Sequence, residues 1–496
     1  MSSLHIVDTI SRDLVYALRT MRRNPVFVMT AVLTLALAIG GNTAMFMVIR
    51  AVLLNPLPYR DSDRLAHLAG GATPTRFAEM SSGARSFAEL GVYSGQESLT
   101  LSGGSEPEVL KGVRVSADFL RILGVTPLRG RGFLPAEDAP GGVPVAMIGA
   151  ELWQRRFGGD PRIIGRTVTL GGAPFTIVAV LPAGFQFPFS GVDVWLTRPS
   201  EFPLIPAKSR ALSPFLAIFG RLRPGLSFER ANAELQVLRR QYAMAHPAML
   251  DAKPKSPVEV TAMKEELVAK ARSMLWMLFG ALGFVLAIAC ANIASLLLTR
   301  ATSRAREFAV RSALGAARAR LIGQLLAESV LLSVFGGALG VLLAAFALRA
   351  IPAIASLNLP RAAEIHMDWM VLGFAAALSI ATGVLFGLAP SLGASRPDPI
   401  NVLRGNGAGA NRDASRGLWA GVNAGSLLSA GQVALSVVLL IGAALLLESV
   451  AHLRRVEVGF NPSNLLTASV TVPPLRYDTD RKKAAFFEEL ARRLGA

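Results

Sequence analysis

Charge is scarce in this chain, and cysteine and lysine are scarcer still. Charged residues make up 17% of the 496 residues, whereas hydrophobic residues make up 52%, and this balance is the reverse of that of a disordered chain. The single cysteine, Cys290, excludes a disulfide scaffold and a zinc site built from cysteines. None of the lysines follows a glycine, so the Gly-Lys pair of a P-loop is missing. An ordinary soluble enzyme and ATP hydrolysis through a P-loop are therefore excluded.

Catalytic and metal-binding patterns are also missing from the sequence. The five histidines are scattered singly: His5, His67, His246, His366 and His452. None belongs to an HExxH motif, which would place two ligands on one helix face. The glycine-rich piece Arg129–Gly132 is not followed by a helix start, so we interpret it as a turn and not a phosphate cradle. We expect no catalytic residues, no metal and no cofactor.

Five long apolar runs stand out instead. They span Val26–Ile49, Met274–Leu298, Leu321–Leu348, Trp369–Pro390 and Leu427–Leu447. Each is near the roughly 20 residues that cross a hydrocarbon core of about 30 Å. None carries Lys, Arg or Asp in its middle, and Glu328 and Glu448 are expected near the ends, where they can reach the interface. Asn42, Asn292 and Gln324 are predicted to form interhelical hydrogen bonds. The pattern predicts an α-helical transmembrane bundle of about five spans and argues against an ion-coupled pump.

The arginines predict the orientation of these spans, because short loops rich in Lys and Arg lie in the cytoplasm. Residues 1–25, the loop 299–320 and the linker 391–426 are basic and are expected inside. Residues 50–273 and the short loop 349–368 are then outside. Much of the net charge of +17 is thereby explained by topology, so the expected partner is a phospholipid membrane and not nucleic acid.

The residues before the first span have helical periodicity. Val7, Ile10, Leu14, Leu18 and Met21 recur at intervals of three and four residues, which predicts an amphipathic helix on the inner leaflet. A solvated helix that merely precedes the span is the alternative. A cleaved signal peptide is disfavoured because the 24 apolar residues of 26–49 exceed a signal core.

The outer segment is long enough to fold as a domain. Strands are predicted at Arg64–Leu68, Val143–Ile148, Thr167–Leu170, Phe175–Val180 and Val192–Leu196, and helices at Arg76–Leu90 and Phe228–Met244. The segments Phe215–Leu222 and Pro257–Ala262, on either side of the second helix, close the domain. We expect a large extracytoplasmic α+β domain built from the two ends, with a β-rich subdomain inserted at about 100–200. Its aromatic side chains Phe185, Phe187, Phe189 and Trp195 are interpreted as core and turn packing and not as a ligand site.

The pattern begins again after the fifth span. Residues 448–496 contain a strand-like stretch, Leu465–Val472, and then an amphipathic helix, Arg481–Leu494. The order of span, strand and helix repeats the order after the first span. We therefore expect a truncated second repeat, or an incomplete gene product, with a flexible linker between the repeats.

The loop between the second and third spans carries an ordered motif. Its sequence over Ser303–Val330, SRAREFAVRSALGAARARLIGQLLAESV, resembles the cytoplasmic coupling segment of FtsX/MacB-type permeases of ABC transporters. The family pattern falls on Arg306, Glu307, Arg311, Ala313, Leu314, Gly315, Ala316, Gln324 and Glu328. The outer stretches Val115–Phe133, Glu151–Gly158, Ile164–Leu170 and Phe175–Gly184 are similar to the MacB-like periplasmic core domain. The restart after the fifth span resembles the subgroup in which two permease halves share one chain.

The resemblance implies a permease in the bacterial inner membrane that couples a separate ABC ATPase subunit to movement of its periplasmic domain, and it implies a periplasmic adaptor as a further partner. Residue chemistry in the loop agrees with this role. Glu307 and Arg311 have the spacing of a helical ion pair, and the small residues 313–316 would let another surface come close. The alternative for the loop is that its arginines only satisfy the positive-inside rule. The alternative for the protein is a structural or signalling membrane protein whose outer domain binds a partner.

Overall fold

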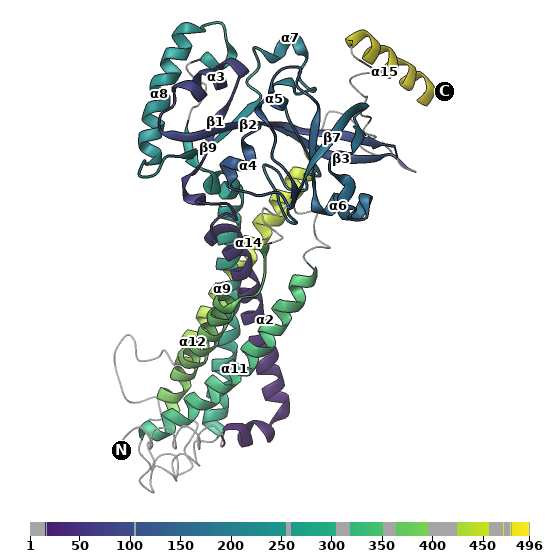
Figure 1. Ribbon diagram of the computed structural model, residues 1–496. Coiled ribbons are helices and arrows are strands. Elements are labelled where there is room, and N and C mark those ends of the chain that lie inside the picture. Colours follow the sequence, from purple (N-terminus) through teal and green to yellow (C-terminus); the bar gives the residue numbers. More distant parts are fainter. Residues whose placement is uncertain are drawn as a thin grey trace, which may run out of the picture. The chain divides into compact units, whose positions relative to one another are not determined.

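The structure is a computed structural model, and it divides the chain into two compact units. It describes residues 15, 17–103, 106–253, 259–303, 318–350, 364–394, 424–455, 470, 477 and 479–495. The first unit comprises residues 1–54 and 271–462, and the second comprises residues 55–270 and 463–496. Figure 1 labels many of the helices and strands.

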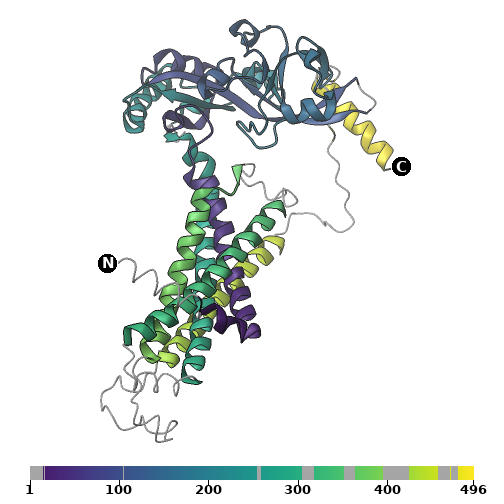
Figure 2. The same cartoon turned by 60° about the horizontal axis from the view of Figure 1, so that its bottom comes forward.

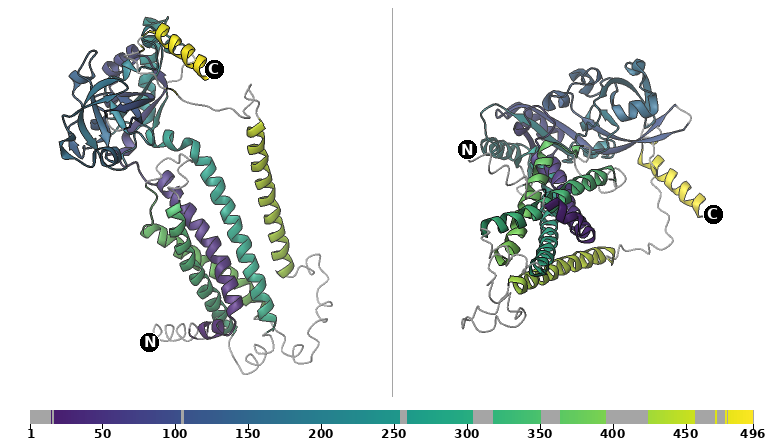
Figure 3. Two further views of the ribbon diagram at one scale, coloured as in Figure 1. Left: turned by 90° about the vertical axis from the view of Figure 1, so that its right-hand side faces the viewer. Right: turned by 90° about the horizontal axis from the view of Figure 1, so that it is seen from below.

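The helical unit contains all five predicted spans. Its helices are α2 (Pro25–Ile49), α9 (Met263–Ser303, which begins in the other unit), α11 (Arg318–Ala350), α12 (Trp369–Ala394) and α14 (Ala424–Arg455). Each contains a window long and apolar enough to cross a membrane. Packing of α11 against α2 and α12 can be followed in Figure 2. The window in α14, coloured yellow-green in Figure 3, has no buried residue among those described.

Glycines bring the helices of the bundle into backbone contact. A Cβ atom at Gly340 of α11 would lie 2.9 Å from the carbonyl oxygen of Ala36, and one at Gly40 of α2 would lie 2.8 Å from that of Gly340. Where α11 meets α12, a Cβ at Gly383 of α12 would lie 2.7 Å from Cα of Val330. Such contacts between small residues are the usual source of helix association where lipid removes the hydrophobic driving force.

One predicted interhelical hydrogen bond is confirmed. The Asn42 side chain is buried on α2 and donates from Nδ2 to the carbonyl oxygen of Leu282 on α9, at 2.9 Å. The same nitrogen donates to Ala38 within its own helix. Asn292 is exposed, and this exposure does not support its predicted role in helix association.

The outer unit is built on one ten-stranded mixed sheet with the order β10-β1-β9-β2-β3-β8-β5-β7-β4, and β6 pairs with β2 and β7. The strands are β1 (Leu65–Ala72), β2 (Phe87–Ser102), β3 (Glu108–Val115), β4 (Arg129–Gly130), β5 (Val145–Gly149), β6 (Thr167–Leu170), β7 (Ala173–Leu181), β8 (Val194–Leu196), β9 (Leu216–Leu222) and β10 (Val260–Ala262). The helices of this unit are α3 (Pro74–Gly83), α4 (Phe119–Leu123), α5 (Pro135–Asp138), α6 (Ala150–Phe157), α7 (Ala207–Arg210), α8 (Phe228–Ala245) and α15 (Asp480–Leu494). The two ends of the segment and its β-rich middle therefore share a single sheet.

Separate apolar cores nevertheless underlie the two parts of the sheet. Helices α3 and α8 cover β1 and β9 (Figure 1) through a cluster that includes Leu68, Met80, Ile218 and Leu235. The middle strands form a second cluster with α6. A third cluster draws on both parts of the sheet. The arrangement agrees with an α+β domain that carries a β-rich insert.

The predicted helix over Arg76–Leu90 is wrong in its second half. Helix α3 starts at Pro74, where the Thr73 side chain caps the amide of Arg76, and it ends at Gly83. Residues from Phe87 onward form β2, the longest strand. The serines and glycine at 81–83 are weak helix formers, and Phe87 and Leu90 are held by pairing of β2 with β9. Strand β3 was not predicted at all.

The interpretation of the aromatic residues as packing is confirmed. Trp195 is fully buried and donates from Nε1 to the carbonyl oxygen of Phe187 at 2.6 Å. Its ring centroid lies 5.3 Å from that of Phe185, and Tyr93 packs edge-on against Phe189. Phe187 and Trp195 are members of the third cluster, and Tyr93, Phe185 and Phe189 pack against it.

The predicted features near the two ends are described only in part. Helix α15 confirms the predicted helix over Arg481–Leu494. The predicted strand over 465–472 lies outside the described residues, apart from Val470, and so does most of the predicted amphipathic helix before the first span.

Candidate coupling site and the links of the outer domain

The predicted coupling segment falls largely outside the described residues, which omit 304–317. Arg306, Glu307, Arg311, Ala313, Leu314, Gly315 and Ala316 belong to this stretch. Gln324 and Glu328 are described on α11, which begins at Arg318. The flanking parts of α9 and α11 therefore define the ends of the segment.

Glu328 does not reach outward as expected. Its residue is 8% exposed, and Gln324 one turn earlier is half-buried. The next residue, Ser329, faces Gly387 of α12, where a Cβ would lie 2.8 Å from the serine side chain. Glu328 and Ser329 are therefore both buried where α11 packs against α12.

The end of α9 is joined directly to the start of α2. The guanidinium of Arg300 lies 3.7 Å from the ring centroid of Phe27, within the range of a cation–π contact. Arg300 is among the last residues of α9, and Phe27 lies in the first turn of α2. The contact fixes the end of α9 where the predicted coupling segment begins. Sequence reasoning missed it because the two residues are far apart in the chain.

An ion pair joins the other end of α2 to α12. Arg50 Nη1 lies 2.8 Å from Asp368 Oδ1, and the two side chains are 18% and 26% exposed. The same carboxylate accepts hydrogen bonds from the amides of Met370 and Val371 and so caps α12. An Asp directly before an apolar run is the signal that could have identified this cap.

One small cavity lies within the described part of the helical unit. This cavity, among α2, α9, α11 and α12, measures about 10 Å³ and is lined by Leu35, Cys290, Ser329, Ser333 and Thr382 among others, which is space for about one water molecule. No cluster of three or more His, Cys, Asp or Glu side chains that could hold a metal occurs among the described residues.

Both chain links to the helical unit meet neighbouring strands of the outer sheet. Strand β1 follows the link from α2, and β10 leads directly into α9. These strands are antiparallel partners, with Ala66 opposite Ala262, so the start of β1 lies beside the end of β10. Leu57 of the first link and Met263 at the start of α9 are both buried in the same cluster. The two links therefore enter the outer domain at one place.

The start of α9 also faces a half-buried histidine of β1. His67 Nδ1 lies 3.9 Å from Glu266 Oε2 in the first turn of the helix. Burial lowers the pKa of His67, and the Glu266 carboxylate acts in the opposite direction. The start of α9 is thus held against the outer sheet by the apolar packing of Met263 and by the contact between His67 and Glu266.

Two family models match the chain. Residues 28–238 match the MacB-like periplasmic core domain, and residues 279–399 match the FtsX-like permease C-terminal domain. The second match includes the predicted coupling segment and the helices on either side of it.

Curated relatives match over more than half of this chain. "Macrolide export ATP-binding/permease protein MacB 2" of Aeromonas hydrophila is 27% identical over 294 residues, or 59% of this chain and 42% of the relative. "Macrolide export ATP-binding/permease protein MacB" of Escherichia coli K12 is 28% identical over 300 residues, or 58% and 42%. The chain thus spans about two fifths of the length of these relatives.

Solved structures of outer domains are also similar. The periplasmic region of MacB from Actinobacillus actinomycetemcomitans aligns with a TM-score of 0.33 and 10% identity, over 45% of this chain and 95% of that one. The extracellular domain of the noncanonic ABC-type transporter YknZ from Gram-positive bacteria aligns with a TM-score of 0.30 and 14% identity, over 40% and 99%.

Proposed function

Since this chain carries a MacB-like periplasmic core domain and an FtsX-like permease domain, it is a permease of the FtsX/MacB type, and we propose that it couples a separate ABC ATPase subunit to movement of its outer domain. ATP hydrolysis would take place in the partner, since the sequence has no Gly-Lys pair for a P-loop. The outer domain would do mechanical work in export or extrusion.

The observation that carries this proposal is the position of the two chain links. They enter the outer sheet at β1 and β10, which are neighbours. A shift of α2 and α9 would therefore act on one edge of a continuous sheet and move the domain as a single body. Two links at distant strands would strain the sheet instead, because packed structures resist deformation.

The tight packing of the helical unit supports mechanical transmission. Backbone contact at Gly40 and Gly340, and the ion pair between Arg50 and Asp368, would make α2, α11 and α12 move together. The cavity of about 10 Å³ among these helices offers no room for a transported organic molecule. We propose that the cargo is moved on the outer side of the membrane and does not cross this bundle.

The proposed contact with the ATPase is the segment from Arg306 to Ala316, supported from within the bundle by Gln324 and Glu328. Helical pairing of Glu307 with Arg311 would shape a short basic helix between α9 and α11. Because this helix would be connected to both α9 and α11, it could transmit a movement of the ATPase subunit to the bundle. We also propose that the protein lies in the bacterial inner membrane, and its candidate membrane-spanning helices and basic loops support this location. A periplasmic adaptor and a second permease half in the same chain are further parts of the proposal.

We expect reversal of one charge in this segment to weaken coupling. The chain should co-purify with an ABC ATPase subunit of its own genome and stimulate ATP hydrolysis in proteoliposomes. Glu307→Lys should lower that stimulation a few-fold, since it turns the favourable i,i+4 pair with Arg311 into a repulsive one, a change of roughly 0.5–1 kcal/mol. Insertion should be unaffected because the loop only becomes more basic.

Glu364→Lys serves as the matched control, because it makes the same charge change outside the coupling segment. Equal stimulation by wild type and Glu307→Lys would show that the segment is not the contact. Failure of every ATPase subunit of the genome to co-purify from intact membranes would favour the structural or signalling alternative.

A further inference from the structure

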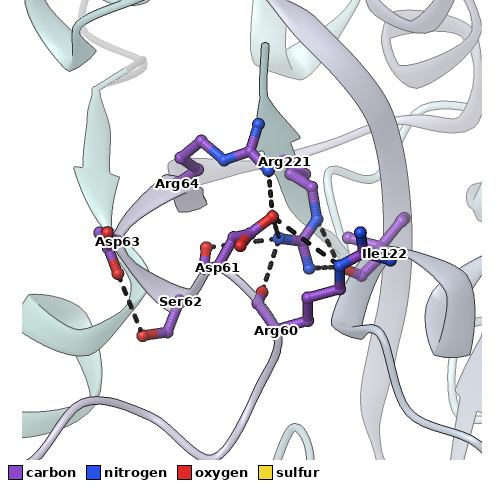
Figure 4. Close-up of polar contacts among 7 residues, drawn as sticks. All are labelled: Arg60, Asp61, Ser62, Asp63, Arg64, Ile122 and Arg221. Carbon is purple, nitrogen blue, oxygen red and sulfur yellow. Dashed lines mark hydrogen bonds and ion pairs between the residues drawn. The ribbon is translucent and has the colours of Figure 1, made fainter. Parts of the chain in front are cut away.

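The link from α2 to β1 is held by one arginine of another strand. Arg221 lies on β9, its residue is only 8% exposed, and its guanidinium points toward the link (Figure 4). Nη1 donates to the carbonyl oxygen of Arg60 at 2.6 Å and to that of Asp61 at 3.3 Å. An ion pair with the Asp61 carboxylate at 3.6 Å adds to these contacts.

The other side of the same guanidinium holds the end of α4. Nε donates to the carbonyl oxygen of Ile122 at 3.0 Å, and Nη2 donates to the same atom. The link itself touches this helix end, since the Arg60 amide donates to the carbonyl oxygen of Leu123 at 3.2 Å. A single side chain thus connects the link, α4 and β9.

The backbone of the link has a conformation that needs such support. Asp61 has φ of 45° and ψ of 50°, the left-handed region that non-glycine residues seldom adopt. Its carboxylate pairs with Arg64 in the next turn (Figure 4), and this contact holds the pKa of Asp61 below its usual value. The residue that turns the chain into β1 is therefore held by arginines on two sides.

We infer that Arg221 acts as a positioning residue that locks the α2 link onto the sheet, so that a displacement of α2 reaches β1 and β9 instead of being absorbed in the link. The inference rests on the proposed mechanical function. The guanidinium is suited to this task because its planar, forked donors reach carbonyl oxygens on two sides at once. A lysine has no such fork and could hold only one side at full strength.

Amide hydrogen exchange on the full chain in detergent tests the lock without any ATPase. Arg221→Met should raise exchange at the Arg60 and Arg64 amides by about tenfold or more, the scale expected when charge-assisted hydrogen bonds are lost. Amides in the middle of β1 and β9 should keep their protection. Arg223→Met is the matched control, since Arg223 donates to the carbonyl oxygen of Phe87 instead of to the link. Unchanged exchange at Arg60 and Arg64 would overturn the inference.

If Arg221→Met unfolds the outer domain, Arg221→Lys serves as a milder second variant, because it keeps the positive charge and loses the forked guanidinium. It should show the same local increase at smaller amplitude, and wild-type protection at both amides would contradict the lock.

The functional consequence is measured in nanodiscs with a bound ATPase subunit. Arg221→Met should retain ATP hydrolysis but lose most of the ATP-driven displacement of the outer domain. A displacement equal to that of wild type would overturn the role of Arg221. Absence of displacement in wild type itself would count against the proposed function, whereas the exchange result would still decide whether Arg221 holds the link.

Discussion

Replacing Gly340 by leucine should prevent α2 and α11 from packing. Any side chain at this position begins with a Cβ placed 2.9 Å from the carbonyl oxygen of Ala36, and Gly40 lies as close. The opposing atoms belong to the backbone, so rotation of a neighbouring side chain cannot relieve the clash. Overpacking typically costs about 1–3 kcal/mol, and we expect the upper end of this range or more.

The change is measured by the thermal unfolding midpoint of the full chain in detergent and by its yield from membranes. Gly373→Leu is the control, because no atom lies within 4 Å of a Cβ built at Gly373 of α12. Equal midpoints and yields for the two variants would mean that the glycine contact does not hold the bundle together.

Replacing Trp195 by alanine should unfold the outer domain and leave the helical bundle inserted. The indole is fully buried among the aromatic rings that join the two parts of the sheet. Truncation of a buried tryptophan to alanine costs about 3–5 kcal/mol, and whole domains have only about 5–15 kcal/mol of stability. Trp195→Phe should be milder, since it keeps a ring and loses the hydrogen bond to Phe187.

Limited proteolysis of the full chain in membranes gives the readout. We expect rapid digestion between residues 55 and 270 in Trp195→Ala, protection in Trp195→Phe close to wild type, and membrane-protected fragments in all three. Wild-type resistance of Trp195→Ala would show that the ring cluster is not central to the domain.

Local composition was sufficient to predict the spans. Each helix of the bundle has an uninterrupted apolar window, and length alone separates such runs from the short strands of a soluble core. The strands β5 to β8 were predicted for a similar reason, since β-branched runs are bounded there by glycine and proline. Helix Arg76–Leu90 was predicted too long because β2 is held by pairing with β9, and its partner residues are distant in the chain. Phe87 pairs with Leu222, 135 residues later, so the pairing leaves no local signal.

Contacts that position the links could not be predicted from sequence. Arg221 lies in a strand whose residues are nearly all buried, so its guanidinium must have hydrogen-bond partners there. Those partners are backbone carbonyl oxygens, which every residue has and which therefore leave no signal in the sequence. The pair of Arg50 and Asp368 depends in the same way on helix packing. The coupling segment is the opposite case, because the sequence identifies it and the structure does not describe it. Its residues were identified by resemblance, and Arg306 to Ala316 stay a prediction because they lie outside the described residues.

Transmission from the bundle to the outer domain is tested most directly by a distance that responds to ATP. One spin label is placed at Val109 of β3 and one at Leu385 of α12, both exposed, in a full chain whose native Cys290 is replaced by serine. Distances are recorded by pulsed electron resonance in nanodiscs with the ATPase subunit bound. The account predicts that trapping ATP shifts the distance distribution and that release restores it. The same distribution with and without ATP, under conditions in which the bound subunit hydrolyses ATP, would contradict it.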